Sequence, residues 1–198
     1  MGGGLRRLLR AVASRGLSVV YGEYAAGKTT LALLVARMLC SGSACLYVTT
    51  EGTEFLERAV QVGAPIDAMD VFDVVDVYDY ASLVAALSRR PPYRLVIVDS
   101  VNAPVRRAEE PGSAELYMLT VAFMKSYCER SGSTAVLTAQ VTGEDERPAY
   151  WPPLLMYADR IVRLDKLGTG LRRALLLPAG LTACFRLTGR GFAETPCP

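Results

Sequence analysis

Short apolar runs alternate with segments of helical periodicity along the first 140 positions of the chain. A short apolar run bounded by glycine or polar residues is typical of a buried strand, whereas apolar residues three or four positions apart indicate a helix. This pattern predicts strands at residues 17–21, 44–49, 71–77, 94–99 and 133–140. It predicts helices at residues 30–40, 54–61, 80–89 and 113–130, and a short basic helix within residues 1–16. In the longest of these helices, the stripe expected to face the core is Leu116, Leu119, Ala122, Phe123 and Tyr127.

The pattern changes beyond residue 140, where strands follow one another without intervening helices. The polar, proline-rich residues 143–153 are expected to form a mobile loop, and strands are expected at 158–165, 172–177 and 182–187. Strands that alternate with helices form parallel sheets, whereas consecutive strands joined by tight turns pair antiparallel. The predicted fold is a single α/β domain over residues 1–198, with a mainly parallel twisted sheet and an antiparallel extension at its C-terminal end.

The composition is that of a globular protein, because 51% of the 198 residues are hydrophobic and 21% are charged. No apolar run is long enough to span a membrane, and the N-terminus lacks the apolar middle of a signal peptide, so a cytoplasmic location without membrane attachment is expected. The formal net charge of +2 favours no class of partner, but basic residues without acids gather at 1–16 and 166–192. These segments form a phosphate-binding surface if they share a face, and are ordinary solvated side chains otherwise.

The five cysteines form no C-x-x-C pair, and the chain has no histidine. A zinc site of the Cys/His type is therefore excluded. The cysteines are interpreted as buried thiols of an intracellular protein, and a Cys40–Cys45 bridge across a turn is left open.

Residues 22–30 match the phosphate-loop pattern G-x-x-x-x-G-K-[ST] in full, between a predicted strand and a predicted helix. The loop consists of Gly22, Glu23, Tyr24, Ala25, Ala26, Gly27, Lys28, Thr29 and Thr30. Its glycines let backbone N–H groups turn toward a phosphate, and the helix that follows directs its N-terminus there. Lys28 is expected to reach the β- and γ-phosphates of a nucleotide, and Thr29 to hold Mg²⁺. The alternative is a glycine-rich turn that matches by chance.

Three further polar residues, Glu51, Asp99 and Gln140, stand at the ends of predicted strands. The carboxyl ends of parallel strands meet at one edge of the sheet, which is the edge where nucleotides bind. Asp99 is expected to hold Mg²⁺ through water, Glu51 to orient a water as general base, and Gln140 to sense the γ-phosphate. For each residue the alternative is capping or closing of an element end.

These motifs, in this order, resemble the ATPase core of the RecA-like recombinases, and their archaeal branch in particular. The segments that carry the resemblance are GEYAAGKTT, YVTTEGTEFLER, LVIVDS and AVLTAQV, followed by FRLT and GF near the C-terminus. The resemblance covers residues 5–192. The N-terminal DNA-binding domain and the filament linker of the full recombinases have no counterpart, so a short, core-only paralogue is expected.

The resemblance implies a RecA-type fold that uses ATP and Mg²⁺. It makes Lys28 and Thr29 the phosphate and Mg²⁺ ligands and Glu51 the catalytic carboxylate. It makes Asp99 the aspartate on the magnesium side and Gln140 the γ-phosphate sensor. It also implies that the arginine of the Glu-Arg pair packs near adenine, and this residue is Arg58.

The resemblance further makes residues 141–157 a DNA-binding loop, whose candidate contacts are Arg147, Tyr150 and Trp151. An aromatic pair beside an arginine suits stacking on the bases of single-stranded DNA, which is worth about 1–3 kcal/mol per base. Covering the ATP site and packing against a partner are the two other uses of these aromatic residues.

Two departures from the family pattern bear on function. Residues 177–180 carry no charge where the family has a basic stretch that reaches a neighbour's γ-phosphate, and residues 144–146 are three acids that repel DNA phosphates. They argue against strand exchange, cooperative filaments and fast hydrolysis. The expected function is that of an ATP-binding paralogue that assists homologous recombination and DNA repair, with weak hydrolysis, single-stranded DNA binding and a possible oligomer. The alternatives are an ATP-switched adaptor for a full-length recombinase and a signalling ATPase that does not use DNA.

Overall fold

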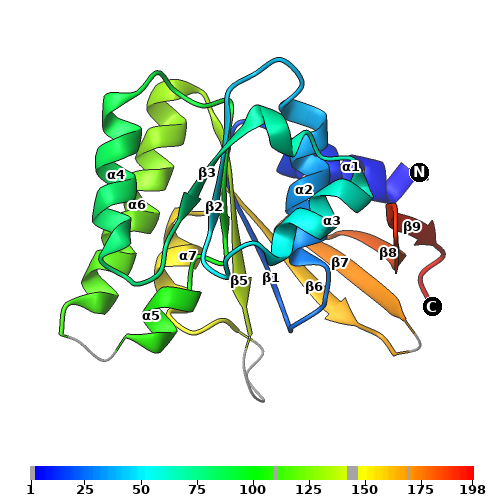
Figure 1. Ribbon diagram of the computed structural model, residues 1–198. Helices are drawn as coiled ribbons and strands as arrows, with labels where there is room; N and C mark the ends of the chain where they lie inside the picture. Colours follow the sequence, from blue (N-terminus) through cyan, green and yellow to red (C-terminus); the bar gives the residue numbers. More distant parts are fainter. Residues whose placement is uncertain (1–2, 109–110, 142–146, 169) are drawn as a thin grey trace.

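A computed structural model describes residues 3–108, 111–141, 147–168 and 170–198. These residues form one sheet with helices on both faces, as Figure 1 shows. The strands are β1 (Gly16–Gly22), β2 (Cys45–Thr49), β3 (Met69–Asp73), β4 (Leu95–Asp99), β5 (Thr134–Gln140), β6 (Arg160–Lys166), β7 (Leu171–Leu177), β8 (Leu181–Thr188) and β9 (Gly191–Thr195). The helices are α1 (Gly3–Val12), α2 (Lys28–Leu39), α3 (Glu54–Val62), α4 (Asp79–Arg89), α5 (Ala103–Arg107), α6 (Ser113–Ser131) and α7 (Trp151–Tyr157), with a short 3₁₀ helix at Ile66–Ala68.

The strand order across the sheet is β3-β2-β4-β5-β1-β6-β7-β8-β9. All pairs from β3 to β6 are parallel, and the pairs from β6 to β9 are antiparallel. This topology confirms the predicted fold class. In the parallel part, Thr49 is the register partner of Asp99, and Gly22 is the partner of Gln140. The C-terminal ends of these strands therefore meet at one edge.

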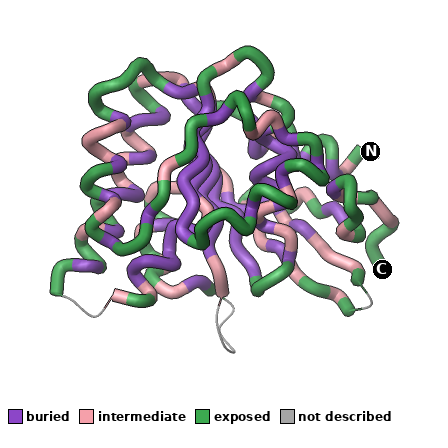
Figure 2. Tube along the Cα trace, viewed as in Figure 1, coloured by how far each residue is buried: buried purple, intermediate pink, exposed green. Residues whose placement is uncertain are grey.

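The core has two layers, one on each face of the sheet. The alternating side chains of β4 divide between them: Leu95 and Ile97 join the layer under α1, α2 and α3, whereas Val96 and Val98 join the layer under α4 and α6. A strand that is buried on both faces reads as a continuous apolar run, which is why β4 was recognisable in the sequence. Figure 2 shows these buried strands at the centre of the molecule.

Strand β3 ends at Asp73, so the strand predicted at residues 71–77 begins late and runs too far. The chain turns there because the Asp79 carboxylate accepts hydrogen bonds from the backbone N–H groups of Val75 and Asp76, at 2.7 and 3.1 Å. The apolar character of this segment still has a role, since Val74 and Val77 are buried beside the sheet. At the other end of the chain, β9 is a fourth strand after the loop region, where three strands were predicted.

The buried face of α6 differs from the predicted stripe. Leu119 is 61% exposed, whereas Tyr117, Val121 and Met124 are fully buried; Tyr127 is buried as expected. Apolar residues occur on almost every side of this helix, so spacing alone left the choice of face open. None of the helices within the described ranges has the length and apolar character needed to cross a membrane.

The stretch expected to be a loop contains helix α7. Pro152 and Pro153 occupy its first turn, where a missing backbone N–H breaks no intrahelical hydrogen bond. The prediction of a loop over residues 143–153 is therefore wrong for residues 151–153. The acids predicted to repel DNA, residues 144–146, lie outside the described residues, as do 142 and 143.

Four of the five cysteines form disulfides, which corrects the interpretation of all five as thiols. Cys40 bonds to Cys45, and Cys184 bonds to Cys197, whereas Cys128 is a free, buried thiol. The first bond joins the residue after α2 to the start of β2. The second ties β8 to the chain after β9. The Cys184–Cys197 bond has no signal in the sequence. The two cysteines meet only because β8 and β9 pair antiparallel, and β9 was not predicted.

Candidate nucleotide-binding site

The phosphate loop connects β1 to α2 and has a backbone that requires its glycines. Gly27 has φ of 106°, in the left-handed region. A Cβ atom at Gly22 would lie 2.4 Å from the backbone oxygen of Leu164, so no side chain fits there. No side chain caps the N-terminus of α2, and its first N–H groups therefore remain available for an anion.

The side chain of Lys28 folds back over this loop. Its Nζ donates to the carbonyl oxygens of Gly22 and Glu23, at 3.1 and 2.8 Å. Burial lowers the pKa of Lys28 to about 8, and the carboxylates of Asp99 and Glu51 offset part of this shift. A phosphate beside Lys28 would restore the favoured charged state, which makes the lysine suited to bind a polyphosphate.

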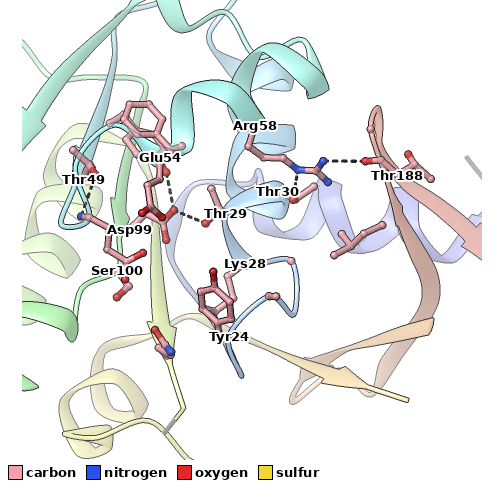
Figure 3. A pocket seen from close by; sticks show the side chains of 18 residues that line it. Tyr24, Lys28, Thr29, Thr30, Thr49, Glu54, Arg58, Asp99, Ser100 and Thr188 are labelled. Atoms are coloured by element: carbon pink, nitrogen blue, oxygen red, sulfur yellow. Dashed lines mark hydrogen bonds between the residues drawn. The ribbon is translucent and has the colours of Figure 1, made fainter. Parts of the chain in front are cut away.

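The carboxylate of Asp99, at the end of β4, accepts hydrogen bonds from three hydroxyl groups. Thr29 Oγ1 and Tyr47 OH each donate to Oδ2 at 2.7 Å, and Thr138 Oγ1 donates to Oδ1. Figure 3 shows the direct hydrogen bond between Thr29 and Asp99. Thr29 belongs to α2 and Thr138 to β5, so the carboxylate is held by parts of the chain that are far apart in sequence.

Glu51 and Gln140 lie along the same edge of the sheet. Partial burial, and then the nearby Asp99 carboxylate, raise the pKa of Glu51. Gln140 is fixed through its backbone: its N–H donates to Asn102 Oδ1 and its carbonyl oxygen accepts from Asn102 Nδ2, each at 3.0 Å. Because Asn102 precedes α5, this pair of hydrogen bonds couples the end of β5 to that helix.

A cleft of about 500 Å³ lies over this edge and brings most of the predicted residues together (Figure 3). The predicted residues that line it are Tyr24, Ala25, Gly27, Lys28, Thr29, Thr30, Glu51, Arg58, Asp99 and Gln140. Three members of the predicted loop do not line it: Gly22, the buried Ala26, and Glu23, whose carboxylate pairs with Lys166 at 3.4 Å.

Arg58 bridges two walls of the cleft, as Figure 3 shows. Its Nε donates to Thr30 Oγ1 at 2.8 Å, and its guanidinium donates to the backbone oxygen of Thr188 at 3.0 Å. Thr188, with its neighbours Leu187 and Gly189, forms a wall supplied by the end of β8. This wall sits beside the mouth of the phosphate loop, since a Cβ at Gly27 would meet Leu187 at 3.1 Å.

Several residues of the site were not identified from the sequence. Tyr47 and Ser100 line the cleft, and Leu187–Gly189 form one of its walls. Thr138 bonds the side chain of Asp99, and Asn102 bonds the backbone of Gln140. A polar residue inside an otherwise apolar strand is a usable signal, and it applies to Tyr47 and Thr138. The residues at the end of β8 have no such signal, because they reach the cleft only when the C-terminal strands pack against the phosphate loop.

The residues present fit a magnesium-bound nucleotide. The hydroxyl of Ser100 is buried, lines the cleft and has no hydrogen-bond partner among the described residues, which leaves it for a ligand. The cleft combines an uncapped helix N-terminus, the ammonium of Lys28 and the carboxylate of Asp99. The first two suit phosphate, and the last suits a hydrated cation.

The three candidate DNA contacts lie apart from this cleft, and none of them lines it. Trp151 packs its ring 5.0 Å from that of Tyr21, and Tyr150 packs 5.8 Å from Tyr117. Each ring therefore has an aromatic partner within the chain, although Tyr150 is exposed and Trp151 is only half-buried. Arg147 is exposed.

Comparison with known proteins agrees with this geometry. The family described as "AAA domain" matches residues 5–146. The DNA repair and recombination protein RadB of Thermococcus kodakarensis is 33% identical, with 90% of each chain covered. The RadB protein of Thermococcus gammatolerans is 30% identical, and the match covers 90% of this chain and 89% of the relative. The RadB protein of Pyrococcus furiosus is 29% identical, and the match covers 96% of this chain and 92% of the relative. With a phosphate loop, a parallel sheet and relatives of this kind, the chain belongs to the RecA-like family, in the branch of the RadB proteins.

Proposed function

We propose that this protein binds Mg-ATP and hydrolyses it slowly, as a recombinase paralogue that assists homologous recombination and DNA repair. One observation carries the nucleotide part: Lys28, Thr29, Glu51, Asp99 and Gln140 come from separate parts of the chain and line one cleft. The names of the RadB relatives support the role in recombination and repair.

In the proposed reaction, a water attacks the γ-phosphate in line with the bond that breaks. Lys28 and the N-terminus of α2 neutralise and orient the phosphates. Thr29 and Asp99 would hold Mg²⁺, which supplies further charge neutralisation when bound. Glu51 orients the water and accepts its proton, and its raised pKa makes it a stronger base. The proposal makes the Gln140 amide the sensor of the γ-phosphate, and the hydrogen bonds between its backbone and Asn102 would pass the presence of the phosphate to α5.

Two variants separate binding from chemistry. Lys28→Ala is expected to weaken ATP binding about tenfold or more, because it removes a charged phosphate donor. Glu51→Gln is expected to bind ATP within about twofold of the wild type, while its single-turnover hydrolysis falls about 10²-fold or more. Binding is measured by calorimetry and hydrolysis with radiolabelled ATP. An unchanged hydrolysis rate in Glu51→Gln would contradict the assignment of the base.

The role in DNA binding rests on Arg147 and on the partly exposed Tyr150. In the same hydrolysis assay, single-stranded DNA is expected to change the rate. Binding through phosphates is expected to weaken steeply as salt rises. A rate and a binding signal that do not respond to DNA would favour the signalling ATPase.

A second candidate is an ATP-switched adaptor that binds a full-length recombinase and barely turns ATP over. The end of β7 and the turn to β8 favour it, because residues 177–180 carry no charge where the family has a basic stretch that reaches a neighbour's γ-phosphate. A wild-type protein that binds ATP tightly but shows no single turnover, with or without DNA and the recombinase, would favour this candidate.

A further inference from the structure

Tyr47 lies beneath the cleft and is fully buried. In the register of β2 and β4 its partner is Ile97, two residues before Asp99, so its phenol extends along the strand toward the carboxylate. The ring stacks on Phe55, with centroids 4.1 Å apart and planes 13° apart. Its hydroxyl donates to Asp99 Oδ2 at 2.7 Å. A rigid aromatic ring therefore presents a single donor to a single carboxylate oxygen.

The Tyr47 hydroxyl occupies one of the lone-pair sites of the Asp99 carboxylate. An ionised carboxylate has about four lone-pair sites, two on each oxygen. Oδ2 accepts from both Thr29 and Tyr47, and Oδ1 accepts from Thr138. Thr29 and Tyr47 thus fill the two sites of Oδ2, and Thr138 fills one site of Oδ1. Among the described residues no donor reaches the second site of Oδ1.

We propose that Tyr47 is a positioning residue for Mg²⁺: its hydroxyl occupies Oδ2 of Asp99 and directs the carboxylate to act through its remaining Oδ1 site, by accepting a hydrogen bond from a water on the ion. This inference rests on the proposed binding of Mg-ATP. Without the phenol hydroxyl, Oδ2 is free to turn toward the ion or toward bulk water, and the carboxylate loses its fixed orientation.

The test is a Mg²⁺ titration of Tyr47→Phe with a fluorescent ATP analogue, compared with binding in EDTA. The substitution removes one oxygen and retains the ring that stacks on Phe55. Affinity in EDTA is expected to stay within about twofold of the wild type, because the metal-free phosphate contacts are untouched. The Mg²⁺ concentration that gives half of the maximal enhancement of ATP-analogue binding is expected to rise about tenfold. This is the effect of losing one hydrogen bond to a charged group.

Tyr93→Phe is the matched control. Tyr93 is also a buried tyrosine whose hydroxyl donates to an aspartate, Asp70 Oδ2, at 2.6 Å. It precedes β4 and so lies at the opposite edge of the sheet from the cleft. Its Mg²⁺ titration is expected to match that of the wild type. Thr138→Val, which removes the donor to Oδ1, is the second variant and is expected to shift the Mg²⁺ titration as well.

Three outcomes would overturn the inference. The first is a Tyr47→Phe titration equal to that of the wild type while the wild type shows Mg²⁺-dependent binding. The second is an equal loss of affinity with and without Mg²⁺, which would mark a general structural role. The third is a wild type whose ATP binding does not depend on Mg²⁺, which would overturn the proposed use of Mg-ATP as well. If Tyr47→Phe does not fold, a Thr138→Val protein whose Mg²⁺ titration matches that of the wild type would overturn the inference.

Discussion

Lys28 shows how burial tunes a single residue for its proposed ligand. The ammonium is almost enclosed and has only backbone carbonyl oxygens as direct hydrogen-bond partners among the described residues. Its charged form is therefore poorly solvated in the free protein, and a bound phosphate relieves that cost. Because burial also lowers the pKa of Lys28 to about 8, phosphate binding by this residue is expected to depend on pH above 8.

ATP affinity is expected to fall as pH rises from about 8 toward 10, by up to about tenfold per pH unit, because Lys28 loses its proton over this range. The effect of pH on folding stability has the opposite sign. Between pH 8 and 10.5, Lys28 is mostly deprotonated in the folded protein but still protonated in the unfolded chain, where its pKa is near 10.5. The contribution of Lys28 to the free energy of unfolding therefore rises with pH over this range. Calorimetric titrations across this pH range measure the affinity. Lys28→Arg stays charged and is expected to show a flat profile, whereas a profile that falls as in the wild type would assign the effect to another group.

Helix α6 shows the limit of periodicity at the scale of an element. Its apolar residues are distributed around the helix, and the side that packs is the one with Tyr117, Val121 and Met124. Tyr117 is buried in one core layer with Tyr80 of α4 and Leu154 of α7, and this long-range packing selects the face.

Val121→Asp is expected to lower the free energy of unfolding by about 3 kcal/mol or more, because it places an unpaired charge in the core. Leu119→Asp on the same helix is expected to change it by no more than about 0.5 kcal/mol, since that side chain is largely exposed. Urea denaturation followed by circular dichroism measures both. Equal destabilisation by the two variants would show that Leu119 is covered, for example by a second copy of the chain.

At the scale of the whole molecule, the two ends of the chain close on each other. The backbone N–H groups of Gly4 and Leu5 donate to the Glu194 carboxylate, at 3.1 and 3.2 Å, and Figure 1 shows the termini on the same side. The Cys184–Cys197 disulfide then fastens the C-terminal residues to β8. Helix α1 and the C-terminal strands thus form one unit with the central sheet.

Loss of this disulfide is expected to destabilise the protein. The bonded cysteines are 13 residues apart, and closing a loop of this size is worth about 3 kcal/mol in the chain-entropy account. Cys197→Ser is therefore expected to lower the melting temperature by ~6–12 °C in oxidising buffer. In reducing buffer the variant and the wild type are expected to melt together. A difference that persists after reduction would mean that the serine acts by another route.

Much of this architecture could be predicted from the sequence, for a physical reason. Parallel strands such as β4 are buried on both faces and stand out as apolar runs, and polar residues at their ends, such as Asp99, then fall at one edge. Features that depend on contacts between distant segments could not be predicted. Tyr47 is recognisable as part of the site only once β2 lies beside β4, and the contact of Trp151 with Tyr21 only once α7 lies near β1.

The wall at the end of β8 gives the cleft an unusual dependence on the last part of the chain. Arg58 reaches Thr188 from α3, and the phosphate loop rests against Leu187 and Phe192. A nucleotide seated there would contact both the first third of the chain and its final hairpin. Because a ligand that binds only the folded state stabilises it, the proposed nucleotide would, when bound, raise the stability of the C-terminal strands.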